Sequence, residues 1–142
     1  GKLTYEQNKS HFSLWCMMNA PLILGNDLRC IKQDVLDIVT NKNLISINQD
    51  PLGKQAKLMK KGSIDILAKP LSGNRTAICL FNSKKGKKQA SVDLQTLVND
   101  KYVQMNHKNS YTLTEQWTGE TVETNGKFKT ELDGYSVKVY IV

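Results

Sequence analysis

Residues 11–28, HFSLWCMMNAPLILGNDL, form the most apolar stretch of this 142-residue chain, with one basic residue, His11, and no acidic residue before Asp27. The stretch is shorter than the roughly 20 apolar residues that cross a bilayer, and it contains Asn19 and Pro21. It also lacks the basic leader and the small-residue cleavage site of a signal peptide. We therefore expect these residues to be buried inside a protein domain.

The first 50 residues predict a helix, a strand and further helices. Thr4 followed by Gln7 fits a capping box, in which each side chain satisfies a free backbone N–H at the start of a helix. This helix should run to about residue 19 and end before Pro21. Residues 22–25 are apolar without alternation, which is typical of a strand covered on both faces in a parallel sheet. Helices should follow within residues 30–48.

The pattern changes after residues 50–53, where alternation of apolar and polar residues takes over. Turn signals such as Asn125-Gly126 and Asp133-Gly134 separate the alternating segments, which predicts short antiparallel strands. We expect two domains: residues 1–50 as the incomplete end of an α/β unit, and residues 51–142 as an all-β antiparallel sandwich. The alternation also predicts that residues 52–142 can close a core of their own.

Charge and cysteine content exclude little. The net charge of +7 comes entirely from residues 51–142, because residues 1–50 contain five basic and five acidic residues. The three cysteines, Cys16, Cys30 and Cys79, are too few for a disulfide framework and have no zinc-ligand spacing. The sequence leaves open whether Cys16 and Cys30 form a disulfide. Two glycosylation motifs, at Asn8 and Asn74, matter only in a secretory pathway.

Three ordered blocks of sequence suggest a family. HFSLWCMMNAPLILGNDLR, NKNLISINQDPLGKQ and PLSGNRTAICLFN, which are residues 11–29, 41–55 and 70–82, resemble the C-terminal part of the melibiase-type α-galactosidases. EQWTGE and YSVKVYIV extend the resemblance to Val142. The resemblance implies the tail of a (β/α)8 barrel, its last helix–strand–helix, followed by an accessory β-sandwich domain. Residues 22–25 would then be the eighth barrel strand.

The resemblance also implies what this chain contributes to the reaction. The family consists of retaining glycoside hydrolases that release terminal α-linked galactose, and some relatives act on α-N-acetylgalactosamine or β-L-arabinopyranose. Both catalytic aspartates would precede Gly1, so none is assigned here and the chain alone should be inactive. Asn26 and Asp27 follow the expected eighth strand, where barrels place their chemistry, and are weak substrate-binding candidates. Asp27 is more readily explained as a loop residue that bonds nearby backbone N–H groups.

Partners and location follow from the same resemblance. A galactose-containing carbohydrate is the expected substrate, with no cofactor, metal, nucleic acid or membrane. A secreted, lysosomal or vacuolar location is favoured, and whether the parent protein is a homo-oligomer stays open.

Other candidate sites have simpler structural explanations. Gln49-Asp50-Pro51 is expected to be an extended turn that leaves the first unit. The basic run at residues 84–88 is expected to be a solvated hairpin tip, since no aromatic residues interleave with it. Trp117 and Tyr111 could form a sugar-stacking platform, although strand aromatics more often fill a core. The alternative functions are therefore a non-catalytic carbohydrate-binding or scaffold module and, on charge alone, a nucleic-acid-binding protein.

Overall fold

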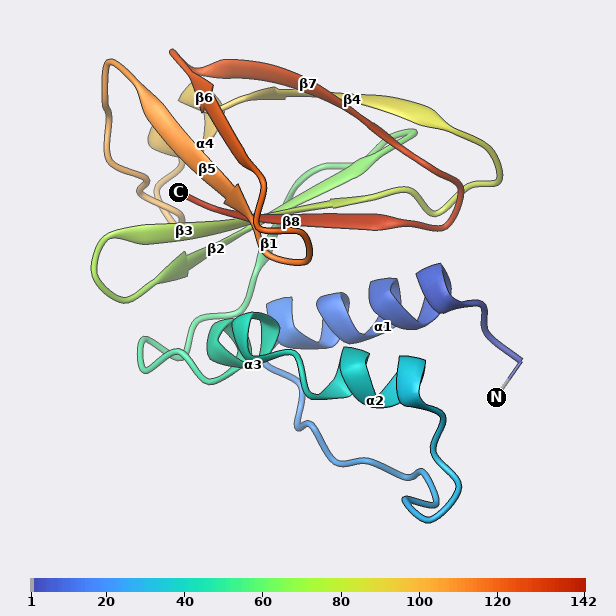
Figure 1. Ribbon diagram of the computed structural model, residues 1–142. Helices are drawn as coiled ribbons and strands as arrows, with labels where there is room; N and C mark the ends of the chain where they lie inside the picture. Colours follow the sequence, from blue (N-terminus) through green and yellow to red (C-terminus); the bar gives the residue numbers. More distant parts are fainter. Residues whose placement is uncertain (1) are drawn as a thin grey trace.

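The computed structural model describes residues 2–142, which form a layer of helices, a large sheet and a small sheet (Figure 1). The elements follow one another as α1 (Tyr5–Met17), α2 (Gln33–Val39), α3 (Lys42–Asn48), β1 (Lys57–Lys60), β2 (Asp65–Leu71), β3 (Arg75–Phe81), β4 (Lys88–Asp93), α4 (Gln95–Val98), β5 (Tyr111–Glu115), β6 (Thr121–Thr124), β7 (Lys127–Leu132) and β8 (Val137–Ile141).

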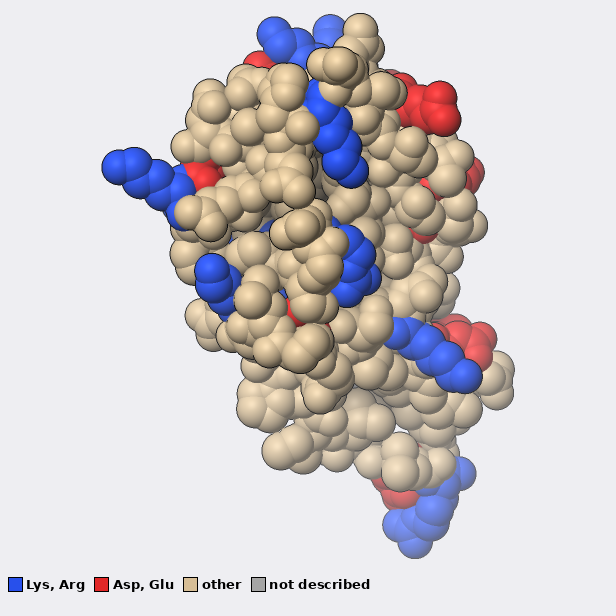
Figure 2. Space-filling view, turned by 90° about the vertical axis from the view of Figure 1, so that its left-hand side faces the viewer, with Lys and Arg blue, Asp and Glu red and all other residues tan. Residues whose placement is uncertain are grey.

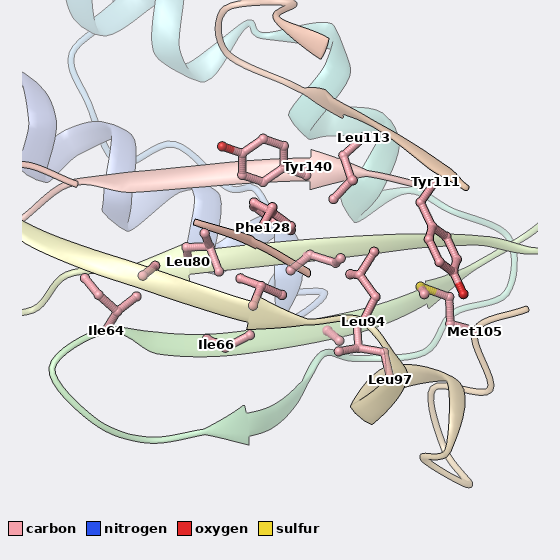
Figure 3. Packing of buried hydrophobic residues seen from close by; sticks show 14 of the residues in the cluster. Ile64, Ile66, Leu80, Leu94, Leu97, Met105, Tyr111, Leu113, Phe128 and Tyr140 are labelled. Carbon is pink, nitrogen blue, oxygen red and sulfur yellow. The ribbon is translucent and has the colours of Figure 1, made fainter. Parts of the chain in front are cut away.

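The large sheet has six strands in the order β1-β2-β3-β8-β5-β6, and the small sheet pairs β4 with β7. Every pair of neighbouring strands is antiparallel. The two sheets enclose one hydrophobic core, to which both contribute alternate side chains (Figure 3). The predicted antiparallel β-sandwich is confirmed. Its last strand, β8, lies between β3 and β5, so the large sheet is complete only when the end of the chain has joined it.

The opposite face of the large sheet is covered by helices. Thr4 and Gln7 form the predicted capping box at the start of α1. One side of α1 then lies against β3 and β8, and it buries Phe12, Cys16 and Met17. These side chains join a second hydrophobic cluster with residues of α2, α3 and the strands: Ile38, Leu44, Ile47, Leu71, Ala77, Cys79, Val137 and Val139. The helical and β segments therefore share a core.

The predicted strand at residues 22–25 is absent from the described structure. This segment is irregular, and the side chain of Ile23 is 79% exposed. An unpaired strand leaves its backbone N–H and C=O groups without partners, so a strand forms only where a neighbouring strand is present. All six strands of the large sheet come from residues beyond 56, and the sheet lies on the opposite side of the helices from the loop that follows α1 (Figure 1).

The basic run at residues 84–88 is not a hairpin tip, because β3 and β4 belong to different sheets. The run is instead the crossover between the sheets, and the buried carboxamide of Asn82 holds it by donating to the carbonyls of Gly86 and Asp133. A methyl group on Gly134 would lie 2.6 Å from the backbone nitrogen of Gly86. Only glycine permits this close approach of the two loops.

Candidate functional site

The loop after α1 contains the two residues that the sequence singled out. Asn26 and Asp27 are both exposed. The Oδ1 of Asp27 accepts hydrogen bonds from the backbone N–H and the Nε of Arg29, each at 3.0 Å, and its Oδ2 lies 2.9 Å from Nη2 of Arg29. Asp27 thus closes a local turn and forms an ion pair with a residue two positions away.

This geometry sets the charge of Asp27. The hydrogen bond from the Arg29 side chain, followed by the bond from its backbone N–H, lowers the pKa of the Asp27 carboxyl below its ordinary value. An ionised carboxylate can accept a proton or act as a nucleophile, but it cannot donate a proton as a general acid. Asp27 alone therefore cannot fill both carboxyl roles of a retaining glycosidase.

Two hollows flank this loop. One has a volume of about 150 Å³ and a mostly apolar lining that includes Phe12, Trp15, Leu22 and Asn26. The other, of about 570 Å³, is lined by residues of the same loop, among them Asp27, and by the start of α1 and α2. His11 stands beside the first hollow, with its ring edge-on to Trp15 at 4.8 Å between centroids.

Large hydrophobic side chains are exposed mainly on the same part of the molecule. Of the eleven with high exposure among residues 2–142, seven fall within residues 2–28: Leu3, Tyr5, Trp15, Met18, Ile23, Leu24 and Leu28. Trp15, Ile23 and Leu24 line the first hollow together, and exposed apolar surface of this kind usually marks an interface with other protein. Residues 11–28 are thus only partly buried within this chain.

No metal or membrane feature accompanies the loop. Among residues 2–142, no group of three or more His, Cys, Asp or Glu side chains is arranged to hold a metal ion. In the same part of the chain, no helix is both long and apolar enough to span a bilayer. His107 lies in an exposed loop.

The basic excess is also dispersed. On the face drawn in Figure 2, Lys and Arg side chains are separated by uncharged surface and interspersed with acidic side chains. Lys84, Lys85, Lys87 and Lys88 are all exposed, and Lys87 lies near Glu131 and Asp133. This arrangement gives little support to a nucleic-acid-binding surface, which needs a continuous basic groove with aromatic faces.

The proposed sugar platform is not formed. Tyr111 is only 3% exposed, and its hydroxyl accepts a hydrogen bond from the backbone of Lys108. Trp117 is half-buried against α1, where its Nε1 donates to Oγ of Ser13 at 3.0 Å and the ammonium of Lys9 lies over its ring. Both aromatic rings therefore serve packing, and Trp117 connects the sheet to the helices.

A buried lysine, which sequence analysis missed, joins the two segments. Lys69 on β2 is 1% exposed, and its ammonium donates to the backbone carbonyls of Cys16 and Ile47 and to the side chain of Asn19. These carbonyls lie in the last turns of α1 and α3, where unpaired C=O groups favour a cation. Alternation along β2 places Lys69 on the same face as Leu67 and Leu71. A charged residue at a position that the pattern assigns to an apolar one could have indicated this buried lysine.

We expect Lys69→Met to lower the free energy of unfolding by about 1 to 3 kcal/mol, because buried carbonyls lose their donor. Burial lowers the pKa of Lys69, which shows that its charge is costly to bury, so part of the loss should be offset. Urea denaturation at low protein concentration measures the change. Lys60→Met on exposed β1 is the control and should stay within about 0.5 kcal/mol. A Lys69→Met variant more stable than the parent would contradict a stabilising role.

Asp50 holds the turn between the helices and the sheet. Its carboxylate accepts hydrogen bonds from the backbone N–H groups of Leu52 and Ser72 and from the Ser72 hydroxyl, and it pairs with Arg75 at 3.2 Å. Burial by itself would raise the pKa of Asp50, but these hydrogen bonds and the Arg75 charge outweigh it and lower the pKa. The Gln49-Asp50-Pro51 segment is therefore a structural connection fixed to the β2–β3 hairpin.

The lowered pKa of Asp50 predicts a pH dependence of stability. Its stabilising contribution should be complete above the ordinary carboxyl pKa of about 4 and should be lost as pH falls through the lower folded-state value. We expect Asp50→Asn to reduce this acid sensitivity and to cost about 1 to 3 kcal/mol at neutral pH. Urea denaturation between pH 7 and pH 2.5 tests this, with exposed Asp133→Asn as the control. Equal slopes for the parent and Asp50→Asn would refute the assignment.

Comparison with known proteins decides the family. The family model described as the alpha galactosidase C-terminal beta sandwich domain matches residues 61–142, and the model described as Alpha galactosidase A matches residues 1–50. The chain belongs to the α-galactosidase family.

Individual family members resemble different shares of the chain. Alpha-galactosidase 3 of Arabidopsis thaliana is 33% identical over all of this chain, which spans 32% of that protein. The alpha-N-acetylgalactosaminidase of Gallus gallus is 42% identical over 58% of this chain and 21% of its own length. The structure of alpha-galactosidase I from Mortierella vinacea shares the fold, with a TM-score of 0.87 at 19% identity over 99% of this chain and 36% of its own.

Proposed function

We propose that this chain is the C-terminal part of an α-galactosidase, a retaining glycoside hydrolase that releases terminal α-linked galactose. In this proposal residues 1–50 complete a (β/α)8 barrel and residues 51–142 form the accessory β-sandwich domain. The order of the two family matches along one chain is the observation that carries the proposal. The chain spans about a third of the Arabidopsis relative, so the activity belongs to a longer protein.

The surface of residues 2–28 supports the barrel assignment. The exposed side chains of Trp15, Ile23 and Leu24 and the mostly apolar hollow beside them would be covered by the remainder of a barrel. Residues 22–25 have the composition of a strand but no neighbouring strand within the described residues. Parallel strands on both sides would satisfy their backbone groups.

In this proposal residues 1–50 support the catalytic barrel and supply no catalytic carboxyl group. Retention requires two carboxyl groups about 5 Å apart, one as nucleophile and one as acid and base. Asp27 forms an ion pair with Arg29 and lies in an exposed turn. We therefore place both catalytic carboxylates in a part of the protein that precedes residue 1, and we assign Asp27 to loop geometry.

Hydrolysis of an aryl α-galactoside tests the proposal. We expect no turnover from the 142-residue chain and clear turnover from a protein that joins this chain to its N-terminal reading frame. In that longer protein, Asp27→Asn should keep most of the specific activity. Turnover by the 142-residue chain that disappears in Asp27→Asn would refute our account of the site. Aryl α-N-acetylgalactosaminide and β-L-arabinopyranoside substrates, assayed in parallel, would identify the sugar.

A further inference from the structure

Two segments carry the acceptor motif for N-linked glycosylation, Asn8-Lys9-Ser10 and Asn74-Arg75-Thr76. A glycan is large and hydrated, so a folded protein tolerates it only where the asparagine faces solvent and no other protein surface covers it. The structure places the two asparagines in opposite surroundings.

Asn74 lies in the turn of the β2–β3 hairpin, at the left of Figure 1 and away from the small sheet. It is exposed and has φ 56°, next to Gly73 with φ 72°. The bonds from Ser72 and Arg75 to Asp50 hold one side of the turn, and backbone bonds between Thr76 and Val142 hold the other. Within residues 2–142, no protein group bonds to the Asn74 carboxamide, so a glycan there would break no hydrogen bond.

Asn8 lies on α1 and is half-buried. It lines both hollows beside the Asn26 loop, together with Gly25 and Val35. The third residue of its motif, Ser10, is buried and its hydroxyl donates to the carbonyl of Tyr135 at 2.9 Å. A glycan at Asn8 would occupy the surface that the proposed function covers with the rest of the barrel.

We propose that Asn74 is an N-glycosylation site of this protein and that Asn8 stays unmodified in the longer protein, where the exclusion of Asn8 rests on the proposed function. In the transfer, Nδ2 of Asn74 attacks the anomeric carbon of a lipid diphosphate-linked oligosaccharide. The new N–C bond replaces the bond from that carbon to the diphosphate oxygen, which leaves with the lipid, while the amide nitrogen loses one proton. Thr76 is 2% exposed in the folded hairpin, so its hydroxyl is available to the transferring enzyme only before β2 and β3 pair.

The test is expression of the 142-residue chain behind a cleavable signal peptide in cultured eukaryotic cells. The mass of the chain from total membranes and medium is measured before and after peptide N-glycosidase F in ¹⁸O water. This treatment converts a glycosylated asparagine into a labelled aspartate and so identifies the site. Asn8→Gln and Asn74→Gln are the matched variants, and analysis of the membrane fraction makes the result independent of secretion.

We expect label at position 74 on the parent chain and on Asn8→Gln, and none at that position on Asn74→Gln. An unmodified parent chain, or label at position 8 in place of position 74, would overturn the assignment. The exclusion of Asn8 is tested on the longer protein expressed in the same way, because only that protein covers the α1 surface; label at position 8 there would overturn it. Because the Asn74 assignment depends only on the hairpin, it can hold even if the longer protein hydrolyses no galactoside.

Discussion

Replacing Glu115 with alanine is expected to lower the free energy of unfolding by about 3 to 5 kcal/mol, a large share of the stability of a domain of this size. Glu115 is 4% exposed, at the end of β5. Its Oε2 accepts hydrogen bonds from the backbone N–H groups of Trp117 and Thr118 and from the Thr118 hydroxyl, at 2.8 to 3.0 Å. Its Oε1 accepts the backbone N–H of Val139 on β8 at 3.0 Å.

The size of this effect follows from the donors that alanine would leave behind. Three backbone N–H groups would lose their acceptor, and each one that stays buried and unsatisfied costs about 1 to 3 kcal/mol, whereas the N–H of exposed Thr118 can bond to water. Water entering the gap would restore part of this loss. The carboxylate also fixes the turn after β5 against β8, so the edge pair β5–β6 should loosen together with that turn.

Urea denaturation of the 142-residue chain at low protein concentration measures the loss. Glu115→Gln should fall between the parent and Glu115→Ala, because its amide oxygen still accepts hydrogen bonds while its NH₂ group opposes a donor. Glu123→Ala, on exposed β6, should change stability by no more than about 0.5 kcal/mol. If Glu115→Ala unfolded at the same urea concentration as Glu123→Ala, the carboxylate would not organise the turn.

The features that sequence predicted well are local. The capping box of Thr4 and Gln7 is decided within one helical turn, and the alternation in β2, β3 and β8 reports directly on two sides of a sheet. The turn signal Asn125-Gly126 correctly marks the end of a strand, although the strands on either side of it, β6 and β7, belong to different sheets and form no hairpin. Each of these follows from the residue itself and its immediate neighbours, so a single sequence contains the necessary information.

The features that sequence missed depend on distant partners. Lys69 and Glu115 are buried because carbonyls 22 and 53 residues away, or an N–H 24 residues away, satisfy them. The crossover at residues 84–88 resembled a hairpin because adjacent strands usually pair, whereas β4 pairs with β7. For the candidate site, the sequence suggested that Asp27 bonds nearby N–H groups, but the ion pair with Arg29 depends on side-chain geometry. Residues 22–25 show the reverse case, a strand pattern without neighbours.

Removing residues 1–51 is expected to cause self-association of the remaining chain. The alternation pattern alone predicted only that residues 52–142 can close a core of their own. The core between the two sheets uses only residues beyond 58 and should persist. The other face of the large sheet would lose its cover, however, and would expose Leu71, Ala77, Cys79, Val137 and Val139. Lys69 would also lose its helix carbonyls, and Trp117 its Ser13 partner. An exposed apolar face on a central part of a sheet favours association.

Residues 52–142 expressed alone should therefore give a β-rich circular dichroism spectrum but elute as oligomers in gel filtration, with a lower melting temperature than the 142-residue chain. The pair Cys79 and Val139 lie directly opposite each other on β3 and β8 at the centre of the uncovered face. The double substitution Cys79→Ser with Val139→Thr makes that face more polar and should restore a monomer in the shortened chain. In the 142-residue chain the same two substitutions should be destabilising, because they place polar groups in the second hydrophobic cluster.

A shortened chain that is monomeric without these substitutions would show that the helices do not protect the sheet from association. The division at residues 50–53 would then separate two independent domains, as the alternation pattern first predicted.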